Sequence, residues 1–252
     1  SDGFLEYLRN FKFTGDVYAF PEGSVMFPGE PIVTVKAPII ECSIIETYLL
    51  LSMNFNSLIA TKTNRIVNSA GDRLVMEFGA RRAQGADASI TGARAAYISG
   101  APITSNTYSA KKYGFKASGT MAHSWIQAFD SEYEAFKTYA KMYPENCILL
   151  IDTYDTLESG LVNAMKVFKE ELVPKGLTGG VRIDSGDLAY LSKEVRKRLD
   201  ENGFEDFKIV ASNSLDEFKI ESLLAQGAKI DSFGIGERLI TAKSDPVFGG
   251  VY

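Results

Sequence analysis

The amino-acid sequence predicts an α/β protein: an irregular seven-stranded βα barrel preceded by a small α+β domain. Two observations support this fold class. From residue 72 onward, short apolar runs alternate with helical patterns, which is typical of parallel strands joined by helices. Polar residues also gather where the apolar runs end, as expected where strand ends share one face. We therefore expect a small, incomplete N-terminal α+β domain over residues 1–70 and the barrel domain over residues 71–252.

The N-terminal part begins with short strands separated by turns. The expected strands are DVYAF (16–20), SVMF (24–27) and PIVTVK (31–36), with Pro- and Gly-containing turns between them. Residues 41–70 then carry apolar side chains at helical spacing, including Ile45, Leu49 and Met53. We expect one or two helices there, ending near Gly71.

Seven apolar runs form the barrel in this interpretation. They are LVMEFG (74–79), ITSNTYSA (103–110), KASGTMAHS (116–124), CILLIDTYD (147–155), GGVRIDSGD (179–187), KIVASNS (208–214) and KIDSFGIG (229–236). Helical patterns cover 131–143, 157–172, 188–202 and 215–227. Seven runs favour a barrel-like sheet over an open doubly wound one. No dinucleotide-binding or P-loop glycine motif follows a run.

Composition narrows the class of protein. The 252 residues are 45% hydrophobic and 23% charged, with a formal net charge of −5. This balance argues against nucleic-acid binding, although a local cationic pocket remains compatible with it. The two cysteines, Cys42 and Cys147, fit no metal or redox spacing, which indicates a reducing, cytoplasmic compartment. No membrane span or secretory signal is expected. The chain begins at Ser1 and stops at Tyr252, two residues after the Gly249-Gly250 pair, so we expect a fragment lacking both termini.

The ends of the seven runs carry the candidate functional residues. They are Phe78, Arg81 and Arg82; Thr104; His123; Asp152; Arg182, Asp184 and Asp187; Ser212 and Asn213; and Gly234 and Gly236. His123 is the only histidine of the chain. The acidic side chains suit Mg²⁺ or sugar hydroxyls, and the arginines and glycine backbone suit phosphates. Together they suggest a site for a phosphorylated sugar with a metal ion.

Simpler explanations exist for each group. They are a core or surface position for His123, a solvated pair for Arg81 and Arg82, a helix N-cap for Asp187, a tight turn for Gly234 and Gly236, and a core position for Phe78.

With these residues set out, the chain resembles the nicotinate phosphoribosyltransferase family, which belongs to the type II phosphoribosyltransferases. The resemblance rests on EFGARRAQGADA, GTMAHSWIQAF, VRIDSGDL, ASNSLDE and SFGIGERL, which occur in the family's order and approximate spacing. The stretch from Gly15 to Leu50 also looks like the family's N-terminal domain, so the resemblance covers nearly the whole chain. Family members are longer at both ends.

The resemblance implies a reaction. Nicotinate attacks C1 of 5-phosphoribosyl-1-pyrophosphate, giving nicotinate mononucleotide and pyrophosphate in NAD salvage. ATP is a co-substrate, Mg²⁺ a cofactor, and His123 stands where the family carries a phosphohistidine. Arg182 and Asp184 join it as implied catalytic residues, Arg182 near the base and Asp184 at the ribose hydroxyls. Asp152 would lie near the metal and pyrophosphate, so Asp152 and Asp184 are the candidate metal ligands.

The resemblance implies substrate contacts as well. Phe78 would stack on the pyridine ring, and Arg81 would lie at the base or the pyrophosphate. The other candidates are Thr104 and, for the 5-phosphate, Ser212, Asn213, Gly234 and Gly236. Related nicotinamide enzymes place an acidic residue near the second strand. The 103–110 stretch has none, which favours nicotinate because an acid would repel its carboxylate.

Two alternatives stay open at this point. One is a sibling type II phosphoribosyltransferase acting on nicotinamide or quinolinate, and the other is a non-catalytic barrel that binds phosphorylated sugars. The resemblance also implies a homodimer that shares its active site. It implies no nucleic-acid or membrane partner.

Overall fold

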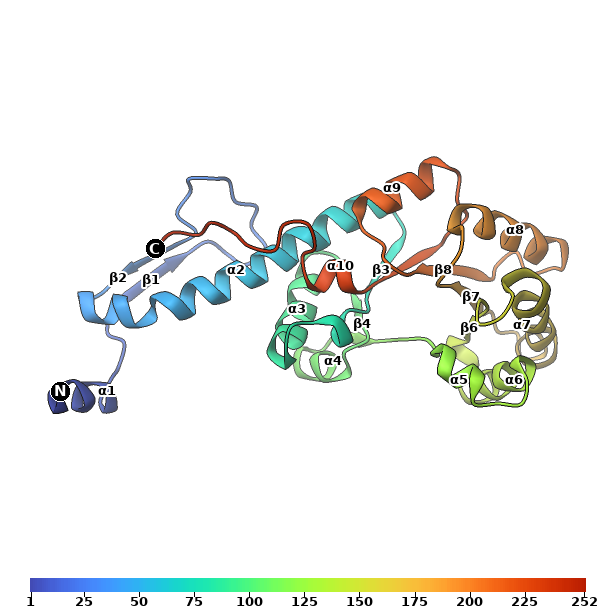
Figure 1. Ribbon diagram of the computed structural model, residues 1–252, viewed down its shortest axis with the longest axis horizontal. Helices are drawn as coiled ribbons and strands as arrows, with labels where there is room; N and C mark the ends of the chain where they lie inside the picture. Colours follow the sequence, from blue (N-terminus) through green and yellow to red (C-terminus); the bar gives the residue numbers. More distant parts are fainter. The chain divides into compact units, whose positions relative to one another are not determined.

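The computed structural model describes residues 1–252, which form two compact units. The N-terminal unit comprises Ser1–Ser57 and Val247–Tyr252, and the sheet unit comprises Leu58–Pro246 (Figure 1). The division falls inside one long helix, α2 (Ile39–Ala70), and not at the 70/71 boundary expected from the sequence. The reason is that the part of this helix from Leu58 onward supplies core residues to the sheet unit, where Ile59, Ile66 and Ala70 are buried.

The N-terminal unit holds α1 (Asp2–Arg9) and a two-stranded antiparallel sheet. Strands β1 (Asp16–Ala19) and β2 (Val33–Lys36) pair from Asp16 with Lys36 to Ala19 with Val33. The strand expected at 24–27 does not form. The backbone turns there instead, since the Phe27 N–H donates to the Glu30 carboxylate at 2.9 Å and Gly29 has a φ of +87°. Only Glu41 is buried among residues 1–57.

The sheet unit is built on seven parallel strands. Their order across the sheet is β5-β4-β3-β9-β8-β7-β6, so the first and last strands of the unit, β3 and β9, pair with each other. No pairing joins β5 to β6, which leaves a curled, open half-barrel. The fold class predicted from the sequence is confirmed, because every predicted run contains one strand. The strands are β3 (Leu74–Glu77), β4 (Ile103–Thr104), β5 (Lys116–Ala117), β6 (Ile148–Leu150), β7 (Gly180–Ile183), β8 (Lys208–Ser212) and β9 (Ser232–Ile235).

Helices connect the strands, and most begin at a side-chain cap. Asn106, Ser131, Asp155, Asp187 and Asp216 each accept a hydrogen bond from a backbone N–H of the following turn. The helices are α3 (Ala86–Ile98), α4 (Thr107–Tyr113), α5 (His123–Gln127), α6 (Glu132–Met142), α7 (Leu161–Val167, with π-helical turns on both sides), α8 (Leu188–Glu201), α9 (Glu217–Ala225) and α10 (Glu237–Ile240). The four helices expected at 131–143, 157–172, 188–202 and 215–227 are confirmed. The second half of the run at 103–110 is α4, not strand.

One face of the curled sheet lines the inside of the half-barrel. Met76, Ile103 and Val210 form a buried cluster there, against which Phe78 and Ile148 pack. Side chains two residues apart along a strand share a face. Residues on the same face at the strand ends therefore meet at the mouth of the half-barrel. They include Phe78, Asp152 and Ser212. No helix of the structure is long and apolar enough to span a membrane.

Candidate functional site

Five of the predicted site residues converge at the carboxyl ends of β6, β7 and β8 and on α5. They are His123, Asp152, Arg182, Asp184 and Ser212. Arg182 is the register partner of Leu150 on one side and Val210 on the other, so its side chain shares their inward face. The cluster therefore lies at the mouth of the half-barrel, as the strand-end argument predicts.

His123 is the first residue of α5 and follows the loop from β5. In Figure 1 this connection runs along the open side of the half-barrel, between β4 and α5. The imidazole Nδ1 lies 3.1 Å from the Thr153 hydroxyl. Its Nε2 lies 3.6 Å from Asp184 Oδ2 and 4.0 Å from Asp152 Oδ1. The side chain is 40% exposed, so the ring is both held by neighbours and reachable from solvent.

Asp152 has the more buried of the two carboxylates in the cluster, with a side chain 1% exposed against 24% for Asp184. Its Oδ2 accepts the Asp184 backbone N–H at 3.0 Å and the Ser185 hydroxyl at 2.5 Å. Its Oδ1 has no hydrogen-bond partner. A buried, unpaired carboxylate oxygen is costly unless a cation or donor occupies the space before it. In this structure the imidazole of His123 lies near that oxygen, with its Nε2 4.0 Å from Asp152 Oδ1.

Arg182 uses its guanidinium to join three elements. Nε donates to Ser212 at 2.8 Å, Nη1 donates to the Thr120 hydroxyl at 2.6 Å, and Nη2 donates to Asp184 Oδ1 at 2.7 Å. The Thr120 contact ties the loop that precedes His123 to the ends of β7 and β8. Arg182 is 13% exposed, and its charge is balanced by Asp184. The arginine thus fixes the geometry of the cluster in addition to any contact with a substrate.

Asp184 is held as a carboxylate. Burial raises the pKa of this carboxyl, but the Arg182 charge and the hydrogen bonds from Ser212 and Arg182 outweigh burial, with a smaller contribution from His123. The net effect is a pKa below the ordinary value of 3.8. Oδ1 accepts from both Arg182 and Ser212, which leaves Oδ2 facing His123.

The donor set at this mouth suits a hard cation. Asp152 Oδ1 and Asp184 Oδ2 both face His123 Nε2, and two carboxylates are what Mg²⁺ takes from proteins when substrate phosphates complete its shell. The structure contains no group of three or more His, Cys, Asp or Glu side chains placed to hold a metal ion by themselves.

Phe78 and Gly234 lie in direct contact. A Cβ at Gly234 would come within 2.6 Å of two ring carbons of Phe78, so the glycine provides the space in which this ring lies. Gly236 precedes α10, and a Cβ there would lie 3.3 Å from the Phe78 carbonyl oxygen. Close packing against Phe78 therefore accounts for Gly234, which lies within β9 and not in the tight turn of its simpler interpretation, and a phosphate contact remains a prediction.

The remaining predicted residues lie elsewhere at the strand ends. Arg81 is exposed in a 3₁₀ turn, η1 (Ala80–Arg82). Asn213 is exposed after β8 and has a φ of +81°. Asp187 caps α8 by accepting the Tyr190 N–H at 3.0 Å, as its simpler interpretation predicts. Thr104 does not join the cluster: its side chain is buried and donates to Glu77 at 2.6 Å.

Two residues of this region were assigned no role from the sequence. Thr153 contacts the His123 ring, and its position directly after Asp152 at a strand end could have marked it. Glu77 is a buried carboxyl next to Phe78. The sequence signal that could have marked Glu77 is an acidic residue near the end of an apolar run.

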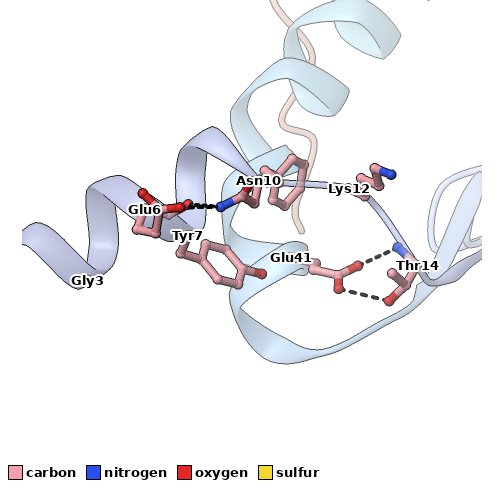
Figure 2. A pocket seen from close by; sticks show the side chains of 8 residues that line it. Gly3, Glu6, Tyr7, Asn10, Lys12, Thr14 and Glu41 are labelled. Atoms are coloured by element: carbon pink, nitrogen blue, oxygen red, sulfur yellow. Dashed lines mark hydrogen bonds between the residues drawn. The ribbon is translucent and has the colours of Figure 1, made fainter.

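A second hollow lies wholly in the N-terminal unit. It has a volume of about 430 Å³ and opens between α1 and the start of α2. Figure 2 shows the Glu41 carboxylate turned toward Thr14. Its two oxygens accept the Thr14 N–H at 2.8 Å and hydroxyl at 2.9 Å. No predicted site residue lines this hollow, and the carboxylate closes a chain turn, so we assign it a structural role.

Comparison with known proteins places these features in a family. The model of the nicotinate phosphoribosyltransferase (NAPRTase) N-terminal domain matches residues 1–54, and that of the nicotinate phosphoribosyltransferase (NAPRTase) family matches residues 74–245. A nicotinate phosphoribosyltransferase from Bacillus subtilis (strain 168) is 50% identical over 275 aligned residues, covering 98% of this chain and 56% of the relative. One from Mycobacterium tuberculosis is 47% identical and covers 100% of this chain and 54% of the relative. The chain thus spans about half the length of these relatives.

Solved structures of similar proteins have the same fold as this chain. The crystal structure of human nicotinic acid phosphoribosyltransferase aligns with a TM-score of 0.84 at 29% identity, covering 94% of this chain and 58% of that one. The nicotinate-nucleotide pyrophosphorylase from Pyrococcus furiosus aligns with a TM-score of 0.81 at 32% identity, covering 91% and 58%.

Proposed function

The chain belongs to the nicotinate phosphoribosyltransferase family, and from this premise we propose that the full-length protein carrying it makes nicotinate mononucleotide. The substrates would be nicotinate and 5-phosphoribosyl-1-pyrophosphate. The pyridine nitrogen forms a bond to C1 of the ribose, the bond from C1 to the pyrophosphate oxygen breaks, and the electron pair leaves with pyrophosphate. The product would enter NAD synthesis by salvage.

The observation that supports this proposal most directly is the cluster of His123, Asp152 and Asp184. Two carboxylate oxygens, one of them unpaired and buried, face a single accessible imidazole at the mouth of a half-barrel. Asp184 keeps its negative charge because its pKa is lowered, so Oδ2 is an acceptor for ribose hydroxyls. A carboxylate near C1 would also stabilise the positive charge that develops on the ribose as pyrophosphate departs.

Mg²⁺ is the cation that we propose for this mouth. Asp152 Oδ1 and Asp184 Oδ2 would hold it, and the unpaired state of the buried Asp152 oxygen fits that role. When bound, the ion would neutralise charge on the leaving pyrophosphate. Phe78 would lie against the pyridine ring, and Arg81 would reach the base or the pyrophosphate. Ser212, Asn213, Gly234 and Gly236 are the proposed neighbours of the 5-phosphate.

We also propose that ATP hydrolysis drives the reaction through His123. A ring nitrogen would attack the γ-phosphorus of ATP, ADP would leave, and water would later release the phosphoryl group. The 40% exposure of the side chain allows such access. The Thr153 hydroxyl holds Nδ1, which leaves Nε2 as the nitrogen turned toward the acids.

A sibling reaction with quinolinate is the first alternative. A dicarboxylate ring would need an excess of positive charge, but the one arginine in the cluster is balanced by Asp184, and Asp152 adds a negative charge. This arrangement favours a ring with one carboxylate over quinolinate. The second alternative is a non-catalytic barrel that binds phosphorylated sugars, which would bind substrate without turnover.

One experiment separates these functions. The full-length protein is incubated with Mg²⁺, 5-phosphoribosyl-1-pyrophosphate and nicotinate, nicotinamide or quinolinate, with and without ATP, and mononucleotides are measured by mass spectrometry. Nicotinate mononucleotide that increases with ATP is expected. Product from another ring would establish a sibling enzyme, and binding without product from any ring would establish the binding barrel.

The assembly and location of the protein are part of the proposal. We propose a homodimer with a shared active site, supported by the exposed side chains of Phe4, Leu5 and Leu8 on α1, which a partner would cover. Both cysteines are free, which fits action in the cytoplasm.

A further inference from the structure

Glu77 is a buried carboxyl group at the end of β3 for which the proposed reaction has no use. The residue is 1% exposed. One carboxyl oxygen accepts the Thr104 hydroxyl at 2.6 Å, and the other accepts the backbone N–H of Gly79. Burial raises the pKa of this group, and the two hydrogen bonds offset burial only in part. Burying a carboxyl group is costly, so its two specific donors call for an explanation.

The side chain of Glu77 points away from the inside of the half-barrel. Met76 and Phe78, its neighbours in sequence, belong to the interior cluster, so Glu77 is on the opposite face of β3. There it lies under the turn that follows the strand. A Cβ at Gly79 would come 2.8 Å from Glu77 Oε1 and 2.5 Å from Ile240 Cβ. The backbone between Phe78 and η1 is therefore pressed directly onto the Glu77 carboxyl.

The second oxygen of Glu77 connects this turn to the neighbouring strand. Thr104 Oγ1, which donates to Glu77, also accepts the Asn106 N–H at 2.9 Å, and Asn106 caps α4. Strand β4 contains only two residues and pairs with β3 through two register positions. The Glu77–Thr104 hydrogen bond thus reinforces a short strand pairing, one strand in from β5 at the open edge of the half-barrel.

We propose that Glu77 is a positioning residue whose two carboxyl oxygens fix the Gly79 amide and the Thr104 hydroxyl, and thereby set the backbone that presents Phe78 and Arg81 to the substrate. This inference rests on the proposed function for the roles of Phe78 and Arg81. The clamp itself, meaning Glu77 with its two donors, is independent of it. Glu77 touches no reacting atom and acts only through the turn at residues 78–82.

The chain offers a matched set of variants for the test. Glu77→Met keeps the size of the side chain but removes both acceptors, which leaves the Gly79 N–H and the Thr104 hydroxyl unpaired. Glu77→Gln keeps an oxygen for Gly79 and places an amide group at Thr104, so it is the conservative variant. Glu132→Met is the control, because Glu132 is also buried and accepts two side-chain donors, Ser159 at 2.6 Å and Asn163 at 3.0 Å, but it lies on α6.

Two measurements are made on the full-length protein. The first is steady-state kinetics, in which Glu77→Met is expected to raise KM for nicotinate about tenfold, the equivalent of one lost hydrogen bond to a buried group, while Glu77→Gln and Glu132→Met stay near the parent. The second is amide hydrogen exchange, in which only Glu77→Met is expected to speed exchange of residues 78–82.

The outcomes separate the clamp from the function. Unchanged exchange at residues 78–82 in folded Glu77→Met would overturn the inference, as would an equal rise in KM in Glu132→Met. If the parent forms no nicotinate mononucleotide, the proposed function fails, and the hydrogen-exchange comparison still decides whether Glu77 sets this turn.

Discussion

The Nε2 atom of His123 lies 3.6 Å from Oδ2 of Asp184. The two residues are 61 positions apart in the sequence: His123 begins α5, which follows β5, and Asp184 directly follows β7. Arg182 maintains this relationship, since one guanidinium contacts both Asp184 and the Thr120 hydroxyl in the loop before His123. A phosphoryl group on the His123 ring, as proposed above, would therefore lie beside the carboxylate proposed to hold ribose, and this contact would couple the two proposed steps.

Replacement of the histidine tests that coupling. His123→Ala in the full-length protein is expected to remove the stimulation of nicotinate mononucleotide formation by ATP, because it removes the accessible imidazole whose Nε2 faces Asp152 and Asp184. The ATP-independent rate should persist, since the carboxylates remain. Product formation with and without ATP is the measurement, and circular dichroism checks that the variant is folded. ATP stimulation that survives in the folded variant would exclude His123 as the phosphoryl carrier.

Replacement of Asp152 is expected to increase the stability of the protein and to decrease its activity. Asp152→Asn keeps an oxygen for the Asp184 N–H and Ser185 but replaces the unpaired buried Oδ1 with a neutral amide. Loss of an unpaired buried charge should raise the free energy of unfolding by about 1 kcal/mol. If Asp152 is the Mg²⁺ ligand proposed above, its loss should lower kcat/KM about 100-fold. Urea denaturation and steady-state kinetics measure the two effects.

Asp216→Asn serves as the control for that prediction. Asp216 is also buried, but its Oδ2 accepts from Arg238 at 2.6 Å. Its replacement leaves the arginine without that partner, so stability is expected to fall while activity is retained. A loss of stability in Asp152→Asn as large as that in Asp216→Asn would show that the Asp152 charge is compensated.

The fold was predictable because the strand and helix patterns of the sheet unit are strong and local. Each run with β-branched and aliphatic residues followed by polar ones, such as CILLIDTYD, formed a strand with its polar end at the mouth. Prediction failed where a few residues decided the outcome. Asn106 caps α4 and ends β4 after two residues, and the Pro28-Gly29 turn excludes a strand at 24–27.

The site was predictable at the level of strand ends but not of side-chain direction. Asp152, Arg182 and Asp184 meet because parallel strands share a carboxyl edge. Thr104 and Glu77 also end strands, yet both point to the outer face, and one residue of register decides this. Strand lengths of two to five residues cannot be read from a sequence to that accuracy, so Thr104 was expected at the site and Glu77 was not.

Asp184 and Glu77 are expected to change stability with pH in opposite directions. The pKa of Asp184 is lowered in the folded state, so its carboxylate stabilises the protein above the ordinary value of 3.8, and this contribution disappears as the pH falls through the folded pKa. The pKa of Glu77 is raised above 4.5, so stability falls as the pH increases from 4.5 through its folded pKa.

Denaturation of Asp184→Asn and Glu77→Gln over a range of pH measures these two slopes. Relative to the parent, Asp184→Asn should lose the most stability at neutral pH and approach the parent as the pH falls below 3.8 and through the lowered pKa of Asp184 in the folded state. Glu77→Gln should become more stable relative to the parent as the pH rises above 4.5. Slopes of the same sign for both variants would contradict the assigned environments.

The last prediction concerns Gly234, where a side chain would collide with the Phe78 ring. A Cβ at this position would lie 2.6 Å from the ring, so Gly234→Ala must displace Phe78 and should destabilise the protein by about 2 kcal/mol. Gly236→Ala brings a Cβ only to 3.3 Å from the Phe78 carbonyl oxygen and should cost less. Thermal denaturation of both variants tests this order.

The double variant Phe78→Ala/Gly234→Ala identifies the cause. If the ring is what the new methyl group strikes, removing the ring leaves room for it, so adding Gly234→Ala to Phe78→Ala should cost almost no further stability, and the double-mutant cycle should show a coupling of about 2 kcal/mol. If instead Gly234 serves only to bring its backbone N–H to a phosphate, the two substitutions add independently in the absence of substrate. In that case Gly234→Ala weakens 5-phosphoribosyl-1-pyrophosphate binding to the same extent with or without Phe78.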